Sequence, residues 1–528
     1  MKTAIPVLRP FVLALLALSN FTTSAQAQTV SIPDPGLNAA IRNALHIPAA
    51  PLTAQDLLTL TNLDASHRNV KSTIGLDAAR NLVSLNLQIN QLTNFSIPTT
   101  LTNLLVLDLS VNPLTSFSAS TNLASITIEG CSLTNLTLPA TLRALTNLDI
   151  EGNSVRTFNL PATLTSLVSL DLGFNLFTSF SLPAGLTNLS TFYFAGNPLT
   201  NVTFPAGLSG MTELNLSQNL LASFTLPTGM TNLQELDLFL NQLTNVTLPD
   251  DVRGLTELDL DFNQLTGLNL PSNLTNLSFL HLRANLFTNF TLPAGLTSLR
   301  YLDVSEGPLH AISLPADLSH LTTLRIAGNT NLTSLRLPLG MTSLASLFLV
   351  DNRLTNIVLP PDLNHLESLN LGGNLLTRLT LPSGLTNLTG LFLVGNQLSS
   401  LTLPPDITNL VTLSFIANPL TTLVLSQPLA ASTNLNVNLT GGISSLPNQG
   451  VNVFTYPLTV QLLQPQQLGG AFQFAITGPP GVYTILQSGD LASWSVLGTT
   501  NNTLGAISFT DETAHFSERK FYRALSVP

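Results

Sequence analysis

Leucines alternate with polar residues along most of the chain, in a pattern that repeats about every 22 residues. The recurring string is L-x-x-L-x-L-x-x-N-x-L-T-x-x-x-L-P-x-x-L, as in LDLFLNQLTNVTLP and, 22 residues later, LDLDFNQLTGLNLP. In the L-x-L part the leucines face one side and the intervening residues face the other, as in a β-strand with one buried face. One such strand cannot bury its apolar face alone, whereas stacked coils can. The pattern therefore predicts a repeat solenoid with a parallel sheet.

An asparagine stands at one fixed position of this repeat. It is found at Asn90, Asn112, Asn153, Asn175, Asn197, Asn219, Asn241, Asn263, Asn285, Asn329, Asn352, Asn374, Asn396 and Asn418. Arg68, Cys131 and Gly307 take its place in three other coils. A carboxamide both donates and accepts hydrogen bonds, so we expect it to bridge backbone groups where the chain turns inward after the strand. Cys131 is expected to be a small buried filler in this column rather than a reactive thiol.

The Leu-Pro step marks the opposite side of each coil. Proline disfavours helix at the residue before it, so segments such as FTLPAGL should be extended or form short 3₁₀ turns. An outer side thinner than a helix predicts a gently curved arc with the parallel sheet on its concave face.

The repeat resembles the leucine-rich repeat family, whose consensus is L-x-x-L-x-L-x-x-N/C-x-L, across roughly residues 60–446. Residues 32–62 resemble the helical N-terminal cap of bacterial internalin-like proteins. Asp34 is expected to cap a helix that starts at Pro35 and ends near Leu45, and Thr53 to cap a second, short helix. These features predict a helical cap at 28–59 and a leucine-rich repeat solenoid at 60–446.

Both ends of the chain differ from the repeats. Residues 1–27 have a short basic start, an apolar stretch and the sequence Ala-Gln-Ala, which together predict a cleaved signal peptide and a secreted protein without a membrane span. Residues 450–528 show short alternating strands and Gly-Pro turns, and resemble a small β-module appended to many secreted bacterial proteins. A β-sandwich is expected there, with Trp494 and Tyr522 in its core.

Charge is scarce and mostly negative. Only 9% of residues are charged, 18 basic against 28 acidic, and no basic stripe is visible, which argues against nucleic-acid binding. The single cysteine excludes an intramolecular disulfide. No catalytic or cofactor-binding motif is present, and a row of strands should offer no deep pocket in which burial raises the pKa of a carboxyl group. We therefore expect a protein that is not an enzyme and needs no cofactor.

Counting from the asparagine column places several charged and aromatic residues on the concave face. The candidate binding residues are Tyr193, Glu235, Asp237, Phe239, Glu257, Asp259, Asp261, Phe262, His281, Arg283, Tyr301 and Asp303. Aspartate after the first leucine is common in the family, so Asp237, Asp259 and Asp303 carry little information individually. Glu257 and Asp261 depart from that pattern, and exposed Phe239 and Phe262 would mark an interaction site.

Three functional interpretations follow. The first is a secreted recognition protein, extracellular or in the cell envelope, whose concave face binds a protein or glycan partner. The second is a structural spacer of the envelope or matrix that is attached to a surface by the C-terminal module. The third is a Ca²⁺ site at Asp237, Asp259 and Asp261, although no loop of known calcium spacing accompanies these residues.

Overall fold

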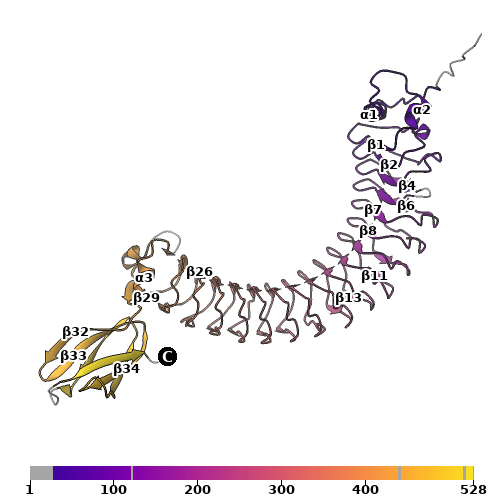
Figure 1. Ribbon diagram of the computed structural model, residues 1–528. Helices are drawn as coiled ribbons and strands as arrows, with labels where there is room; N and C mark the ends of the chain where they lie inside the picture. Colours follow the sequence, from indigo (N-terminus) through magenta and orange to yellow (C-terminus); the bar gives the residue numbers. More distant parts are fainter. Residues whose placement is uncertain (1–27, 120–122, 438–441, 515–518, 527–528) are drawn as a thin grey trace, which may run out of the picture.

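The computed structural model describes residues 28–119, 123–437, 442–514 and 519–526. The predicted signal peptide, residues 1–27, lies outside them. The chain winds into coils that stack in an arc, with the helical cap at one end and the C-terminal module at the other (Figure 1). This arrangement confirms the predicted solenoid.

Two helices close the N-terminal end of the stack. Helix α1 (Pro35–Leu45) has Asp34 as its N-cap residue, with proline in the first turn. One carboxylate oxygen of Asp34 caps the helix, while the other accepts hydrogen bonds from two backbone N–H groups of the first coil. Helix α2 (Ala54–Leu57) has a reciprocal capping box between Thr53 and Asp56. Both predicted caps are confirmed. None of the helices that the structure describes has the length and apolar character needed to span a bilayer.

A single 18-stranded parallel sheet lines the concave face, with strands joined in the order of the coils. Its strands are β1 (Asn62–Asp64), β2 (Ser84–Asn86), β3 (Val106–Asp108), β5 (Ser125–Thr127), β7 (Asn147–Asp149), β8 (Ser169–Asp171), β10 (Thr191–Tyr193), β12 (Glu213–Asn215), β14 (Glu235–Asp237), β16 (Glu257–Asp259), β17 (Phe279–His281), β19 (Tyr301–Asp303), β21 (Thr323–Arg325), β23 (Ser346–Phe348), β25 (Ser368–Asn370), β26 (Gly390–Phe392), β28 (Thr412–Ser414) and β30 (Asn436–Val437). Equivalent residues of neighbouring coils face each other, as Glu235 faces Glu257.

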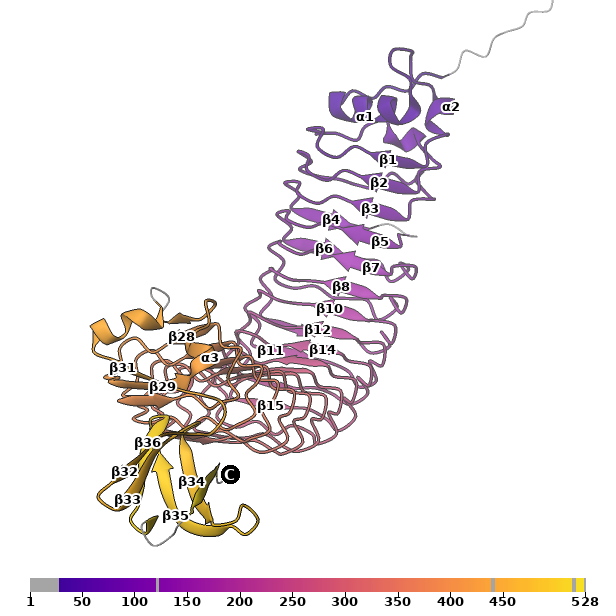
Figure 2. The ribbon, with the colours of Figure 1, turned by 60° about the vertical axis from the view of Figure 1, so that its left-hand side comes forward.

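Short strands also run along the outer side of the arc. They are β4 (Ser116–Ser118), β6 (Asn135–Thr137), β9 (Ser179–Ser181), β11 (Asn201–Thr203), β13 (Ser223–Thr225), β15 (Asn245–Thr247), β18 (Asn289–Thr291), β20 (Ala311–Ser313), β22 (Ser334–Arg336), β24 (Asn356–Val358), β27 (Ser400–Thr402), β29 (Thr422–Ser426) and β31 (Asn452–Tyr456). They pair two by two, except that β27, β29 and β31 form a group of three. The outer row is thus broken where the inner sheet is continuous, and it is extended rather than helical, as predicted (Figure 2).

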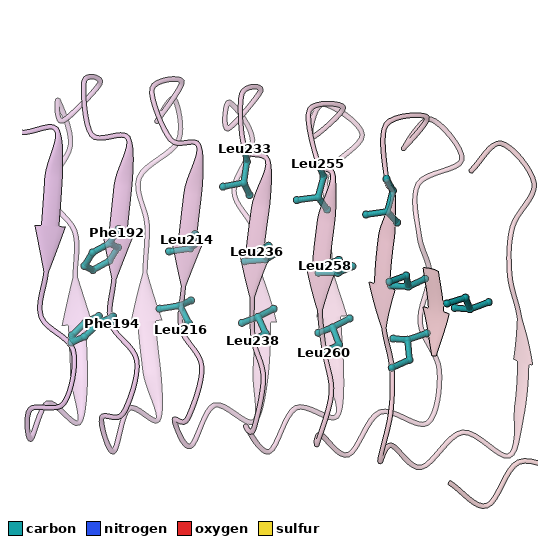
Figure 3. Close-up of a cluster of buried hydrophobic side chains, with 14 of the residues drawn as sticks. Phe192, Phe194, Leu214, Leu216, Leu233, Leu236, Leu238, Leu255, Leu258 and Leu260 are labelled. Carbon is teal, nitrogen blue, oxygen red and sulfur yellow. The ribbon is translucent and has the colours of Figure 1, made fainter. Parts of the chain in front are cut away.

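The core lies between the two rows of strands. Leucines such as Leu236, Leu238 and Leu258 point into it from successive coils (Figure 3). The asparagine column runs beside them and is buried in most coils. The amide group of Asn263 donates to the carbonyls of Leu238 and Leu260, at 3.0 and 3.1 Å, while its oxygen accepts the N–H of Leu243 at 3.0 Å. The predicted bridging role of the carboxamide is confirmed.

Short helical segments lie in the connections, mostly near the two ends of the array. They are η1 (Leu76–Ala78), α3 (Gln427–Ala430), η2 (Ile443–Ser445) and η3 (Pro447–Gln449). The C-terminal module follows β31 and consists of two three-stranded antiparallel sheets. Its strands are β32 (Gln461–Leu468), β33 (Ala471–Thr477), β34 (Gly481–Ser488), β35 (Ser495–Asn502), β36 (Ala506–Asp511) and β37 (Phe521–Ser526).

The core of the module is built around Phe474 and Tyr483, and Tyr522 packs against it as predicted. The prediction that Trp494 belongs to this core is wrong. Trp494 lies in the connection between β34 and β35, where its indole N–H donates to the carbonyl of Leu491 at 3.2 Å. The carboxylate of Asp490 accepts two N–H groups of the same connection, so the loop folds on itself and holds the indole outside the sheets.

Candidate functional site

Each coil presents three outward positions on the concave face: the first and third residues of the inner strand, and the residue two further on. In strands β10 to β19 these positions form three columns. The first column is Thr191, Glu213, Glu235, Glu257, Phe279 and Tyr301; the second is Tyr193, Asn215, Asp237, Asp259, His281 and Asp303; the third is Ala195, Ser217, Phe239, Asp261, Arg283 and Ser305. The structure therefore brings the predicted residues onto one face, and Phe262 lies directly after the third column.

The second column has a structural task. The carboxylates of Asp237 and Asp259 each accept the backbone N–H of the residue two positions on, both at 2.9 Å. Asp303 does the same at 3.0 Å. A side chain that accepts this backbone N–H as the strand ends contributes to the fold of its own coil. Aspartate in this column is thus explained by the fold.

Asp261, in the third column, is half-buried and connects two coils. Its carboxylate accepts the backbone N–H of Arg283 at 2.5 Å. The guanidinium of Arg283 in turn forms a 2.6 Å ion pair with Glu306 and lies 5.4 Å from the ring centroid of Phe262. Phe262 is exposed, while Phe239 is half-buried beside it, with ring centroids 5.5 Å apart in an edge-to-face arrangement. The prediction that both rings are exposed holds for Phe262 only.

The first column has no comparable structural explanation. Glu213, Glu235 and Glu257 face one another on adjacent strands, with like charges in register. They surround a shallow hollow of about 140 Å³, whose walls also include Asp237 and Asp259. Burial, followed by repulsion from the two flanking glutamates, raises the pKa of Glu235. Carboxylates of three consecutive coils therefore share one small space.

Few groups balance these charges. The Tyr193 hydroxyl donates to Glu213 at 2.6 Å, so Tyr193 contacts a glutamate that was not among the predicted binding residues. His281 Nε2 lies 3.8 Å from the Glu257 carboxylate, and its ring packs against Tyr301 in a tilted arrangement with centroids 4.9 Å apart. For Glu235, no ion pair is formed within the residues that the structure describes.

The expectation that the array cannot raise the pKa of a carboxyl group is wrong. Burial, reinforced by the charge of Asp259, raises the pKa of Asp261 to about 7. Burial also raises the pKa of Asp171 to about 7, with further contributions from Asp149 and Glu151. A shallow sheet face is enough, because side chains of adjacent strands, about 4.8 Å apart, screen one another from water.

These upstream carboxylates were missed by the sequence interpretation. Asp149, Glu151 and Asp171, with Glu129 nearby, occupy the same second and third columns two to four coils before Glu213. Extending the column alignment toward the N-terminus would have found them, because the register is the same. The acidic character of the concave face thus covers more coils than the predicted residues indicate.

Two groups of side chains have ligand atoms close enough to gather around a cation. Asp259, Asp261 and His281 have such atoms within 4.8 Å of one another, and so do Asp149, Glu151 and Asp171. The predicted Ca²⁺ ligands were Asp237, Asp259 and Asp261, whereas the residue that lies close to Asp259 and Asp261 is His281 and not Asp237. An imidazole is a poor ligand for Ca²⁺, which prefers oxygen. Exposed acidic groups of this kind are common without an ion.

Comparison with known proteins agrees with this architecture. The model of the BspA type leucine-rich repeat region matches residues 109–211, 172–282, 262–371 and 327–434, which together make up more than half of the chain. No curated protein sequence matches the chain.

Solved structures show the same fold at low sequence identity. The functional domain of InlJ from Listeria monocytogenes is 20% identical with a TM-score of 0.50, covering 86% of this chain and 96% of its own. YopM from Yersinia enterocolitica is 23% identical with a TM-score of 0.51, covering 79% and 94%. Toll in its complex with Spatzle from Drosophila is 21% identical with a TM-score of 0.53, covering 75% and 60%.

Proposed function

The chain belongs to the BspA type leucine-rich repeat family, and we propose that it is a non-enzymatic recognition protein, secreted or held in the cell envelope, that binds a protein or glycan partner on its concave face. Leucine-rich repeat proteins of this kind generally mediate protein binding. The internalin-like architecture supports a location outside the cytoplasm.

The observation that carries the proposal is the column of Glu213, Glu235 and Glu257. Like charges directly opposite each other on neighbouring strands destabilise a sheet. The second-column aspartates compensate for this repulsion by accepting backbone N–H groups. Within the described residues, the three glutamates make no hydrogen bond to the backbone of their coils. A row of charges that weakens the fold is accounted for by a partner that neutralises it.

The alternative is a spacer, in which the array only sets a distance and the C-terminal module attaches it to a surface. The connection between the repeat array and the C-terminal module supports the spacer function. The Tyr456 hydroxyl at the end of β31 is buried and donates to the carbonyl of Leu403 at 2.6 Å. The chain thus enters the module from a strand that is fixed to the stack.

Affinity capture separates the two functions. The full chain is immobilised and exposed to envelope extract and culture medium of the source cell, beside a variant with Glu235→Gln and Glu257→Gln. The matched control carries Asp250→Asn and Glu512→Gln, two exposed carboxyl groups outside the concave columns. A partner retained by the chain and the control but lost by the concave variant supports recognition. Equal retention by all three rejects the concave site and favours the spacer.

A further inference from the structure

In every coil from Arg68 to Asn418, the residue before the asparagine-column position has a left-handed backbone conformation. In the coils with a side chain at this position φ lies between 48° and 60°, and six coils have glycine instead: Gly130, Gly152, Gly196, Gly328, Gly373 and Gly395. We call these positions the turn row. Glycine adopts this conformation freely, whereas any residue with a Cβ is strained in it. Backbone conformation alone therefore favours glycine at every position of the turn row.

Five turn-row positions have large apolar side chains that remain accessible to solvent. Ile89, Val111, Phe174, Leu240 and Phe262 are between 37% and 48% exposed. Side chains exposed to this degree gain little from burial in the folded chain. Isoleucine and valine are especially unfavourable here, because β-branched residues rarely adopt positive φ. Only Ile89 with Val111, and Leu240 with Phe262, lie on adjacent coils, and we call these exposed apolar positions of the turn row the ridge.

Two residues of the ridge lie on the coils that form the glutamate hollow, separated from it by Phe239 and Asp261 of the third column. Leu240 and Phe262 belong to the coils of β14 and β16, the strands that supply Glu235 and Glu257. Each of these two coils thus has acidic side chains in its first columns and an apolar side chain in the turn row. Guanidinium already packs against this surface, since Arg283 lies over the Phe262 ring. The face is suited to cationic side chains that have apolar neighbours.

We propose that the partner is a protein segment in which basic side chains alternate with apolar ones, lying along the array over strands β12 to β17. This inference rests on the proposed function and names the chemistry of its ligand. Charge complementarity selects the occupant: ammonium or guanidinium groups enter the hollow among Glu213, Glu235 and Glu257, and apolar side chains cover Leu240 and Phe262. A neutral glycan leaves the glutamates unbalanced, and nucleic acid is repelled by them.

Synthetic ten-residue peptides test the proposal directly. One alternates arginine with leucine, one arginine with serine, and one glutamate with leucine, and binding to the full chain is followed by fluorescence anisotropy. The arginine–leucine peptide should bind about tenfold more tightly than the arginine–serine peptide, and the glutamate–leucine peptide should not bind. Higher salt should weaken both basic peptides.

Glycine substitutions in the turn row test the ridge, because the backbone strain that they remove offsets the contacts of Phe262 with Phe239 and Arg283. Leu240→Gly and Phe262→Gly together remove backbone strain, so the variant should melt no earlier than the parent, and the tenfold preference for leucine should disappear. Gln218→Gly, at the same row without a large apolar side chain, is the matched control and should keep the preference. Equal affinity for the two basic peptides, or a preference that persists in the double variant, overturns the inference.

The Glu235→Gln, Glu257→Gln variant distinguishes the two levels of the argument. If it loses both basic peptides while the ridge variant behaves as the parent, the acidic recognition face stands and the apolar part of the inference fails. If no basic peptide binds the parent chain, the partner chemistry proposed here is wrong, and the recognition function then depends on the capture experiment alone.

Discussion

The ring of Phe174 lies over the backbone of Gly196 in the next coil. A Cβ added to Gly196 would come within 2.5 Å of the Phe174 Cδ1 atom, and the φ of Gly196 is +65°. The backbone conformation favours glycine here, and the ring also occupies the space that a Cβ would need.

Gly196→Ala is expected to destabilise the array by more than the roughly 1–2 kcal/mol of the left-handed conformation alone. Gly130→Ala is the control, because the Cβ there has φ +60° but meets no atom nearer than 3.7 Å. Urea unfolding followed by circular dichroism measures both. Adding Phe174→Ala to Gly196→Ala should return the loss to the Gly130→Ala value, and an unchanged loss would show that the ring is not the obstacle.

The carboxyl groups with raised pKa values should give the stability of the chain an unusual dependence on pH. Asp171 and Asp261 have a folded-state pKa of about 7, above the value of about 3.9 for an unfolded aspartate. Between these values the folded chain binds more protons than the unfolded chain, so the free energy of unfolding should fall as the pH rises from about 4 to 7. Paired aspartates in most proteins act in the opposite direction.

Asp171→Asn combined with Asp261→Asn should weaken that dependence, because asparagine keeps the acceptor oxygen without the charge. Urea midpoints at pH 5 and pH 8 provide the measurement, and the parent midpoint should be lower at pH 8. Asp250→Asn, an exposed carboxyl group on the outer edge, should leave the slope unchanged. A double variant with the slope of the parent would contradict the assignment.

Loss of a single column carboxamide should be costly. Asn263→Ala leaves the N–H of Leu243 without its acceptor and removes one of the two carboxamide donors from the carbonyls of Leu238 and Leu260, which Asn241 and Asn285 still reach. We therefore expect a loss on the order of 2 kcal/mol. Asn245→Ala, at an exposed position of the outer row, should change the stability by less than about 0.5 kcal/mol. Similar unfolding midpoints for the two variants would mean that water replaces the carboxamide.

The Cys131 thiol should be slow to react. Burial raises its pKa, and Sγ lies 3.4 Å from both the backbone N–H of Asn112 and the carbonyl of Leu109. Ellman's reagent should therefore modify the folded chain more slowly than the urea-unfolded chain, by a factor on the order of ten or more. Asn245→Cys, introduced into a chain with Cys131→Ser, gives the rate of an exposed thiol. Equal rates for the two cysteines would indicate an accessible Cys131.

The repeat made most of the fold predictable. Leucine spacing and the asparagine column define each coil, and Asp34 and Thr53 mark the helices of the cap by local capping chemistry alone. The outer strands were predicted as extended from the Leu-Pro step, but their pairing in twos was not, since it depends on how far curvature separates neighbouring coils.

The candidate site was less predictable, because its properties arise between coils. The pKa of Asp261 is raised first by burial against neighbouring strands, which no single repeat encodes, and then by the charge of Asp259 in its own coil. An outer brace was also missed: the carboxylate of Asp251 accepts the N–H of Gly229, 22 residues earlier, at 2.7 Å. Asp317 and Gly295 repeat this contact. Trp494 was misplaced because aromatic residues are usually buried, whereas here the hydrogen bonds of a connection decide its position.

The interrupted outer row gives the molecule a bending mechanics of its own. The inner sheet is a continuous line of hydrogen bonds that resists stretching, whereas the outer strands are joined only in short groups. Among the described residues, no strand pairing holds the spacing between those outer groups, whereas strand pairing holds the spacing of every inner strand. Any change in the radius of the concave face must therefore be taken up in the gaps of the outer row, while the inner stack stays paired.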